Sequence, residues 1–180
     1  NYQYGNNIHV PYSIGTLVSY LKSKDNLKSK FEFKKTAVFR DRIEEYIETY
    51  TNADVLLCSC YVWNWEITNY LAKKVKENNP NCLIIFGGPH VPQNSSGFFE
   101  EHSYVDILVH GEGEVTIEEI FRKYLENKNY EDVKGISTKE FNTLLRERIE
   151  DFSILPSPYL DNTIWDLVDK DLGVRWDVSW

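Results

Sequence analysis

Several features are scarce or missing in this 180-residue sequence. No apolar run reaches the roughly 18 residues that a membrane-spanning helix needs, which argues against a membrane protein. Lysine and arginine number 20 against 28 aspartate and glutamate residues, so the formal net charge of −8 disfavours nucleic acid as a partner. The three cysteines have no disulfide-framework spacing, which indicates reduced thiols and a cytoplasmic location.

Methionine is also absent, and no charged-then-apolar leader stands at the beginning of the chain. We therefore expect the chain to be a piece of a longer protein, cut at both ends. Its length suits one compact domain with a connecting arm, because two full domains with separate cores need more residues.

Apolar runs of strand length alternate with segments of helical period, which predicts βαβ units. The clearest strands are nearly continuous apolar runs, typical of a parallel sheet covered on both faces, at residues 55–60, 82–86 and 106–109. Weaker strands are predicted at 31–39 and at 133–138, the latter in a hairpin with 144–148. Residues 1–4 are interpreted as a truncated first strand of this sheet, followed by a loop over 5–11.

Helical stripes of apolar residues at i, i+3 and i+4 spacing cover residues 14–21, 43–50, 67–75 and 117–125. The last helix is predicted to begin with a capping box between Thr116 and Glu119. The pattern favours an α/β fold, a Rossmann-like (flavodoxin-like) open parallel sheet with helices on both faces, over residues 1–150.

Residues 151–180 read as a linker, because Pro156 and Pro158 interrupt regular structure. Two helical turns over 163–169 follow. An apolar alternation from Val174 to Trp180 then predicts an entering strand, for which the sequence suggests no partner within the chain.

Ligands of open parallel sheets bind beyond the carboxyl ends of the strands. The loops expected at that edge cover residues 5–12, 61–65, 87–90 and 111–114, which are rich in glycine, asparagine or aromatic residues.

The sequence of each loop is compatible with a purely structural role as well as with a functional one. Gly87-Gly88 after a strand permits close approach of a ligand to the backbone, although such a pair, taken alone, is more often only a tight turn. Residues 111–113 lack the third glycine of a dinucleotide fingerprint. Glu112 and Glu114 suit paired carboxylates or the dipole of the following helix.

Cys58 and Cys60 lie two apart on one side of a strand, where packing thiols are favoured over a metal site. The four histidines have no metal-ligand spacing. Among them, His90 is the strongest candidate for a functional role because it follows the Gly-Gly turn directly. Trp63 and Trp65 either cover a large flat ligand together, or one of them packs under the loop.

Taken in order, several segments resemble the N-terminal half of cobalamin-dependent radical SAM proteins across nearly the whole chain. They are the residues at 1–5 and 10–15, Cys58-Ser59-Cys60-Tyr61-Val62-Trp63-Asn64, Phe86-Gly87-Gly88-Pro89-His90, Gly111-Glu112-Gly113-Glu114 and Leu155-Pro156-Ser157-Pro158-Tyr159-Leu160. The resemblance implies a Rossmann-like domain that holds cobalamin against the carboxyl edge of its sheet.

The same resemblance implies cofactor contacts, and no catalytic or metal-ligating residue, at Ser59, Tyr61, Val62, Trp63, Asn64, Gly87, Gly88, Pro89, His90, Gly111, Glu112, Gly113 and Glu114. Carriers that ligate cobalt from below use an Asp-x-His-x-x-Gly loop, which this sequence lacks: Asn7 stands where the aspartate would be, before His9. We therefore expect no histidine ligand to cobalt.

The implied function is to position a corrinoid for radical or methyl-transfer chemistry. The parent protein would also carry a [4Fe–4S] cluster and S-adenosylmethionine on a radical SAM catalytic domain in the same chain. The cysteine motif for that cluster is absent from this sequence, so the piece alone would not be an enzyme. The alternative is a non-enzymatic corrinoid carrier or sensor. A receiver-type signalling module is disfavoured because the strand ends lack a phosphate-accepting aspartate.

Overall fold

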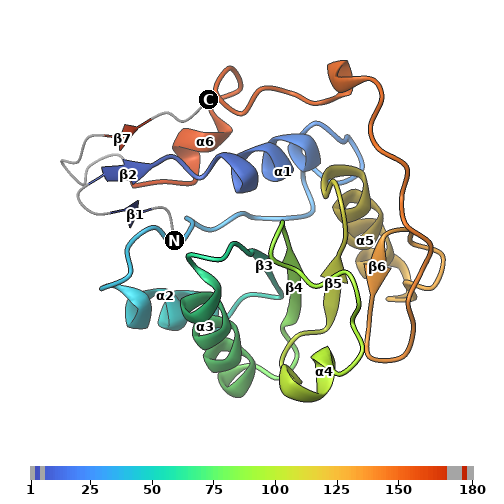
Figure 1. Cartoon of the computed structure of the whole chain (residues 1–180). Helices are drawn as coiled ribbons and strands as arrows, with labels where there is room; N and C mark the ends of the chain where they lie inside the picture. Colours follow the sequence, from blue (N-terminus) through green and yellow to red (C-terminus); the bar gives the residue numbers. More distant parts are fainter. Residues whose placement is uncertain (1–2, 5–6, 170–175, 178–180) are drawn as a thin grey trace. The chain divides into compact units, whose positions relative to one another are not determined.

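The computed structural model describes residues 3–4, 7–169 and 176–177 (Figure 1). The chain forms two compact units. One covers Arg42–Arg148, and the other combines Asn1–Asp41 with Ile149–Trp180. The expected division into 1–150 and 151–180 by function stays a prediction.

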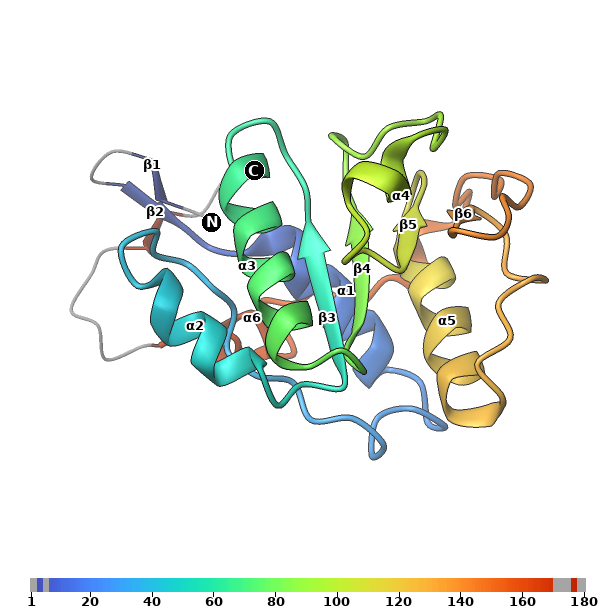
Figure 2. The ribbon, with the colours of Figure 1, turned by 90° about the horizontal axis from the view of Figure 1, so that it is seen from below.

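The 42–148 unit is built around a four-stranded sheet in the order β3-β4-β5-β6. The strands are β3 (Val55–Ser59), β4 (Leu83–Gly87), β5 (Ile107–Val109) and β6 (Ile136–Ser137). The first three are parallel and β6 runs antiparallel to β5, so the three central strands are confirmed (Figure 2). Residues of β4 and β5 such as Ile84, Phe86 and Leu108 are fully buried. Each such side chain contributes roughly 1.5–3 kcal/mol through burial.

Four helices accompany this sheet: α2 (Ile43–Tyr50), α3 (Trp65–Asn78), α4 (Phe98–Glu101) and α5 (Glu114–Glu126). Figure 1 shows α3 and α4 on one side of the sheet and α5 on the other, which confirms the predicted α/β fold. The stripes of α3 and α5 are buried, although Tyr70 and Leu125 at their margins are exposed. Tyr70 instead donates a hydrogen bond to Glu44 of α2 at 2.9 Å.

Two strand predictions in the middle of the chain are wrong. Residues 31–39 form no ladder with any described segment, and the backbone N–H of Thr36 donates to the Leu167 carbonyl instead. The hairpin after β6 is reduced to a single bridge between Ser137 and Asn142. Residues 144–148 are not a strand: the Gly135 N–H donates to the Leu144 carbonyl, but no ladder with a described segment continues beyond it, and Arg146 directs its side chain to Thr116 in the first turn of α5.

The predicted capping box of α5 is also wrong. The helix begins at Glu114, two residues earlier than expected, and no side chain caps it. Thr116 therefore lies inside the first turn, fully buried, with its hydroxyl group directed to other partners.

The second unit contains a separate small sheet in the order β1-β2-β7. Strand β1 (Gln3–Tyr4) is antiparallel to β2 (Asn7–His9), and β2 is parallel to β7 (Trp176–Asp177). The expectation that residues 1–4 belong to the main sheet is thus wrong, and the predicted 5–11 loop contains β2. Strand β7 lies in the predicted entering strand but has a partner in this chain, because Ile8 and His9 offer it an open edge.

The described residues of this unit form the helices α1 (Tyr12–Lys22) and α6 (Thr163–Asp166) and the 3₁₀ turn η1 (Phe152–Ile154). Helix α6 is shorter than the two turns predicted over 163–169. The close approach of α1 and α6 explains Gly15, since a Cβ there would lie 3.3 Å from Ile164. The Ser19 hydroxyl group of α1 donates to the carboxylate of Asp161, which lies just before α6. Among the described residues, no helix is long and apolar enough to cross a membrane.

Candidate functional site

Three of the four loops singled out in the sequence lie at one edge of the β3–β6 sheet. They follow β3 at residues 60–64, β4 at 88–90 and β5 at 110–113. Because these strands are parallel neighbours, their carboxyl ends meet, as the sequence predicted. The fourth loop belongs to the other unit, where β2 occupies part of it.

The loops after β3 and β4 are packed directly on one another at Gly88. This residue has a φ of +105°, and a Cβ built on it would lie 2.8 Å from the carbonyl oxygen of Cys60. Two backbone hydrogen bonds lock the contact: the Cys60 N–H donates to the Gly87 carbonyl at 2.7 Å, and the His90 N–H donates to the Cys60 carbonyl at 3.1 Å. Gly88 therefore serves both as a turn residue and as a close backbone approach.

Asn64 organises the loop after β3. Its side-chain oxygen accepts a hydrogen bond from the Tyr61 N–H at 2.8 Å, and its amide nitrogen donates to the Ser59 carbonyl at 2.8 Å. Asn64 is buried, and both its amide oxygen and its amide nitrogen make these hydrogen bonds within the loop. The side chain therefore holds the loop closed.

The tip of this loop presents apolar groups to solvent. Val62 is 70% exposed and Trp63 is 57% exposed. The Trp63 indole stacks on the Tyr61 ring with centroids 4.5 Å apart. Large apolar side chains that remain exposed next to a strand end are typical of a ligand-binding surface.

The second indole of the pair, Trp65, packs inside. Its ring lies against Phe86 of β4 and against the rings of His90 and His102, with centroids 4.9 Å and 5.7 Å away from the two histidines. Of the two interpretations of the Trp63–Trp65 pair, the structure supports the one in which one tryptophan packs inside, whereas Trp63 stays more than half exposed. The ring contact with Trp65 also sets the position of His90, which is exposed beside Pro89.

The loop after β5 begins with a buried histidine, His110. Its Nε2 lies 2.8 Å from the Ser137 hydroxyl group of β6, and its Nδ1 has no hydrogen-bond partner in the described part of the chain. Burial lowers the pKa of His110, because an imidazolium loses its hydration there. Sequence reasoning missed this contact, since it depends on the antiparallel pairing of β6.

The rest of this loop is exposed at Gly111 and partly buried over residues 112–114. Gly111 has a φ of +75°, and no atom lies within 4 Å of a Cβ built on it. Gly113 and Glu114 then lead into α5, with the Ile117 N–H donating to the Gly113 carbonyl at 2.8 Å. Glu112 lies between the two glycines.

The three cysteines are buried, as predicted for packing thiols. Burial raises the pKa of the Cys60 thiol to about 12 and that of Cys82 to about 11, and it raises the pKa of Cys58 as well. Thiols with such pKa values are protonated at neutral pH and are neither nucleophiles nor good metal ligands. Among the described residues, no group of three or more His, Cys, Asp or Glu side chains could hold a metal ion.

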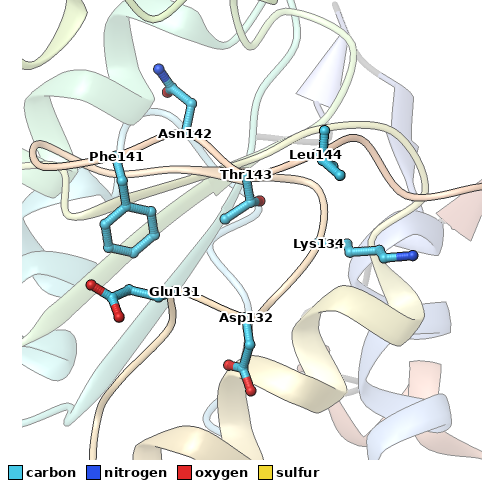
Figure 3. Close-up of a pocket in the computed structure, with 7 residues that line it drawn as sticks. All are labelled: Glu131, Asp132, Lys134, Phe141, Asn142, Thr143 and Leu144. Carbon is cyan, nitrogen blue, oxygen red and sulfur yellow. The ribbon is translucent and has the colours of Figure 1, made fainter.

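A pocket of about 420 Å³ lies elsewhere in this unit, over the arm around β6 (Figure 3). Its lining residues are Glu131, Asp132, Lys134, Phe141, Asn142, Thr143 and Leu144. In Figure 3 the Asp132 and Lys134 side chains point away from each other rather than converging on a common point. None of the residues at 59–64, 87–90 or 111–114 lines it, so it is not the strand-end site.

Comparison with known proteins places the chain in a family. The model of the B12 binding domain family matches residues 18–121. The chain is 33% identical over 178 residues to the cobalamin-dependent radical SAM methyltransferase TokK of Streptomyces tokunonensis, covering 95% of this chain and 26% of that protein. It is 35% identical over 156 residues to the 2-(S-pantetheinyl)-carbapenam-3-carboxylate methyltransferase of Streptantibioticus cattleyicolor, covering 84% of this chain and 23% of that one.

A third relative, the uncharacterized methyltransferase PH0819 of Pyrococcus horikoshii, is 30% identical over 112 residues, which cover 60% of this chain and 24% of the relative. The chain thus spans about a quarter of the length of these relatives. The family model covers 104 of the 180 residues and includes all three strand-end loops. The chain belongs to the B12-binding domain family.

Proposed function

We propose that the chain holds the corrinoid at the carboxyl edge of β3, β4 and β5. The observation that carries this proposal is the packing at Gly88. Because Gly88 has no side chain, the loops after β3 and β4 pack directly on one another at the carboxyl edge of the sheet. The proposed contacts are Ser59, Tyr61, Val62, Trp63, Asn64, Gly87, Gly88, Pro89, His90, Gly111, Glu112, Gly113 and Glu114.

The residues at this edge suit a large, flat, partly polar ligand. Val62 and Trp63 offer an exposed apolar surface that a macrocycle would cover. Gly111 is exposed and a Cβ built on it would meet open space, so a ligand could approach its backbone closely. The buried amide of Asn64 would act through the loop that it closes, and the loop would keep Trp63 in place before the ligand arrives.

The bound corrinoid would supply a cobalt centre able to carry a methyl group. This chain would bind and orient it, and the rest of the parent protein would provide the remaining chemistry. The names of two relatives, both methyltransferases that are about four times as long as the matched region, support a parent of this kind. We propose that the parent carries a radical SAM domain with a [4Fe–4S] cluster and S-adenosylmethionine, and that it performs methyl transfer or another radical reaction.

This parent architecture is tested by the gene sequence beyond Trp180. We expect three cysteines spaced Cys-x-x-x-Cys-x-x-Cys within about two dozen residues, whose thiolates would hold three irons of the cluster. A stop codon, or a continuation without those cysteines, would favour the alternative of a corrinoid carrier or sensor. The three buried, unpaired thiols also support the proposed reducing, cytoplasmic location.

Corrinoid binding is tested by titrating the chain with hydroxocobalamin and following absorbance and tryptophan fluorescence. We expect saturation below about 100 μM, and no saturation in that range would contradict the proposal. Trp63→Phe should remove most of the fluorescence change, because this indole is the exposed one at the site. The matched control is Trp165→Phe in α6, which replaces an indole packed near Tyr159 and should preserve the response.

A further inference from the structure

Both ends of the loop over residues 111–113 are tied to the same short segment before β6. At one end, the His110 N–H donates to the Gly135 carbonyl at 2.8 Å. At the other end, the Thr116 hydroxyl group in the first turn of α5 lies 3.4 Å from the Lys134 carbonyl, to which it donates. The position of the loop therefore depends on where residues 134–135 are held.

Residues 134–135 are held in turn by Arg146. The Gly135 N–H donates to the Leu144 carbonyl at 2.8 Å, and a Cβ on Gly135 would lie 3.3 Å from the His110 carbonyl oxygen and 3.5 Å from the Arg146 Cβ. Gly135 has a φ of +80° and is thus packed between the end of β5 and the arm that carries Arg146. A side chain here would force these two segments apart.

The Arg146 guanidinium group closes the arrangement. Its Nε donates to the Thr116 hydroxyl oxygen at 2.9 Å, and its Nη2 donates to the Glu119 carboxylate at 2.5 Å and lies 3.4 Å from the Lys134 carbonyl. The arginine side chain is only 17% exposed, so solvent screens the pair with Glu119 less than it would at the surface. One side chain thus joins the first turns of α5 to the segment before β6.

We infer that Arg146 is a positioning residue that holds the 111–113 loop in its ligand-ready conformation. The inference rests on the proposed function, in which this loop contacts the corrinoid. Arg146 touches none of the proposed contact residues in any of these hydrogen bonds, so it acts through Thr116, Lys134 and Gly135. When a loop is ordered only part of the time, the apparent Kd rises in inverse proportion to the fraction of molecules in which it is ordered.

The geometry requires arginine rather than a generic cation. A guanidinium group presents several N–H donors in a fixed plane, and here it serves a hydroxyl oxygen and a carboxylate at once. Lysine would keep the charge beside Glu119 but has a single terminal nitrogen, which cannot hold both acceptors in the same orientation.

The experiment compares the unmodified chain with Arg146→Ala and Arg146→Lys. For Arg146→Ala we expect the Kd for hydroxocobalamin to rise about tenfold, which corresponds to about 1.4 kcal/mol. Amide hydrogen exchange over residues 110–117 should accelerate in the ligand-free protein, while β4 keeps its protection. Arg146→Lys should recover only part of the loss, and millimolar ethylguanidinium, unlike ethylammonium, should restore binding to Arg146→Ala.

Two controls separate positioning from general stability. Arg122→Ala removes an arginine of α5 that is more exposed than Arg146 and pairs with Glu118 at 3.6 Å, and it should leave the Kd and the exchange of 110–117 unchanged. Val75→Ala opens a cavity near the far end of α3, and it lowers stability without touching the loop. Equal weakening by Val75→Ala and Arg146→Ala would overturn the inference.

Failure of the inference is distinguishable from failure of the proposed function. If the unmodified chain does not bind hydroxocobalamin, the proposed function fails, and the exchange measurement on the ligand-free chain still tests whether Arg146 orders the loop. If the unmodified chain binds and Arg146→Ala changes neither the Kd nor the exchange, Arg146 has no positioning role. If Arg146→Ala does not fold, Arg146→Lys carries the same comparison.

Discussion

Gly88 offers the sharpest test of how the strand-end edge is built. In Gly88→Ala the new methyl group would lie 2.8 Å from the Cys60 carbonyl oxygen and 3.1 Å from the Cys60 nitrogen. Real Cβ atoms essentially never approach a backbone atom to 2.8 Å, so the loop after β3 or the loop after β4 must move. Movement weakens the hydrogen bonds that Cys60 makes with Gly87 and His90.

The magnitude follows from two costs. Placing an L-residue at a φ of +105° costs roughly 1–2 kcal/mol. Weakening one or two of the Cys60 hydrogen bonds costs about another 0.5–1.5 kcal/mol each. We expect the free energy of unfolding to fall by about 2–4 kcal/mol, a large share of the stability of a small domain.

Gly97→Ala is the matched control, because Gly97 has a φ of +77° but no atom within 4 Å of its built Cβ. This variant bears the strain of the positive φ without the clash. Both variants gain the same benefit from reduced freedom in the unfolded chain, which therefore cancels in the comparison.

The assay is urea unfolding followed by tryptophan fluorescence, with the midpoint and the slope fitted separately. Gly88→Ala should be less stable than Gly97→Ala by about 1–2 kcal/mol at an unchanged slope. If the two variants lose equal stability, the two loops are not packed on one another through Gly88, and this account of the edge is refuted. Hydroxocobalamin binding should weaken in Gly88→Ala and be preserved in Gly97→Ala.

Three further predictions concern single side chains. Because burial lowers the pKa of His110, the fold keeps its full stability above the unfolded value of 6.5 and loses stability as the pH falls below that value. His110→Gln keeps a polar partner for Ser137, and it should flatten the dependence of the free energy of unfolding on pH between neutral and pH 5.5. An unchanged profile would contradict this prediction. Electron paramagnetic resonance of bound Co(II) should show no splitting from a protein imidazole nitrogen and no change in His9→Ala, whereas a nitrogen triplet lost in that variant would reverse the assignment. Asp106→Ala should lower stability by about 2 kcal/mol in urea unfolding, because the carboxylate accepts from the Ile84 N–H at 2.7 Å, and a loss below about 0.5 kcal/mol would contradict this role.

The sequence was sufficient where local pattern and burial agree. The apolar runs around Leu56, Ile84 and Leu108 predict central parallel strands because they have strand length and are nearly continuous, and they alternate along the chain with segments of helical period. The glycine pair after β4 indicates a loop at the carboxyl edge for the same reason, since strand order places that loop beside its neighbours. The order of these motifs along the chain gave the resemblance to cobalamin-binding proteins, and the match of the B12 binding domain model over residues 18–121 confirms the family.

Tertiary structure alone decided the contacts between distant segments. Thr116 and Glu119 have the spacing of a capping box, yet Arg146, 30 residues after Thr116, binds both side chains instead. Trp63 and Trp65 are equivalent in the sequence, and only the position of Phe86 and His90 determines which indole is packed.

The edge strands show the same limit. Residues 31–39 alternate like a strand, but a strand forms only where a neighbouring backbone offers a ladder, and the Thr36 N–H bonds the Leu167 carbonyl instead. Strand β7 pairs with β2 although the two are more than 160 residues apart. The local sequence pattern indicates which side chains are buried. The packing of the whole chain determines which segment they are buried against.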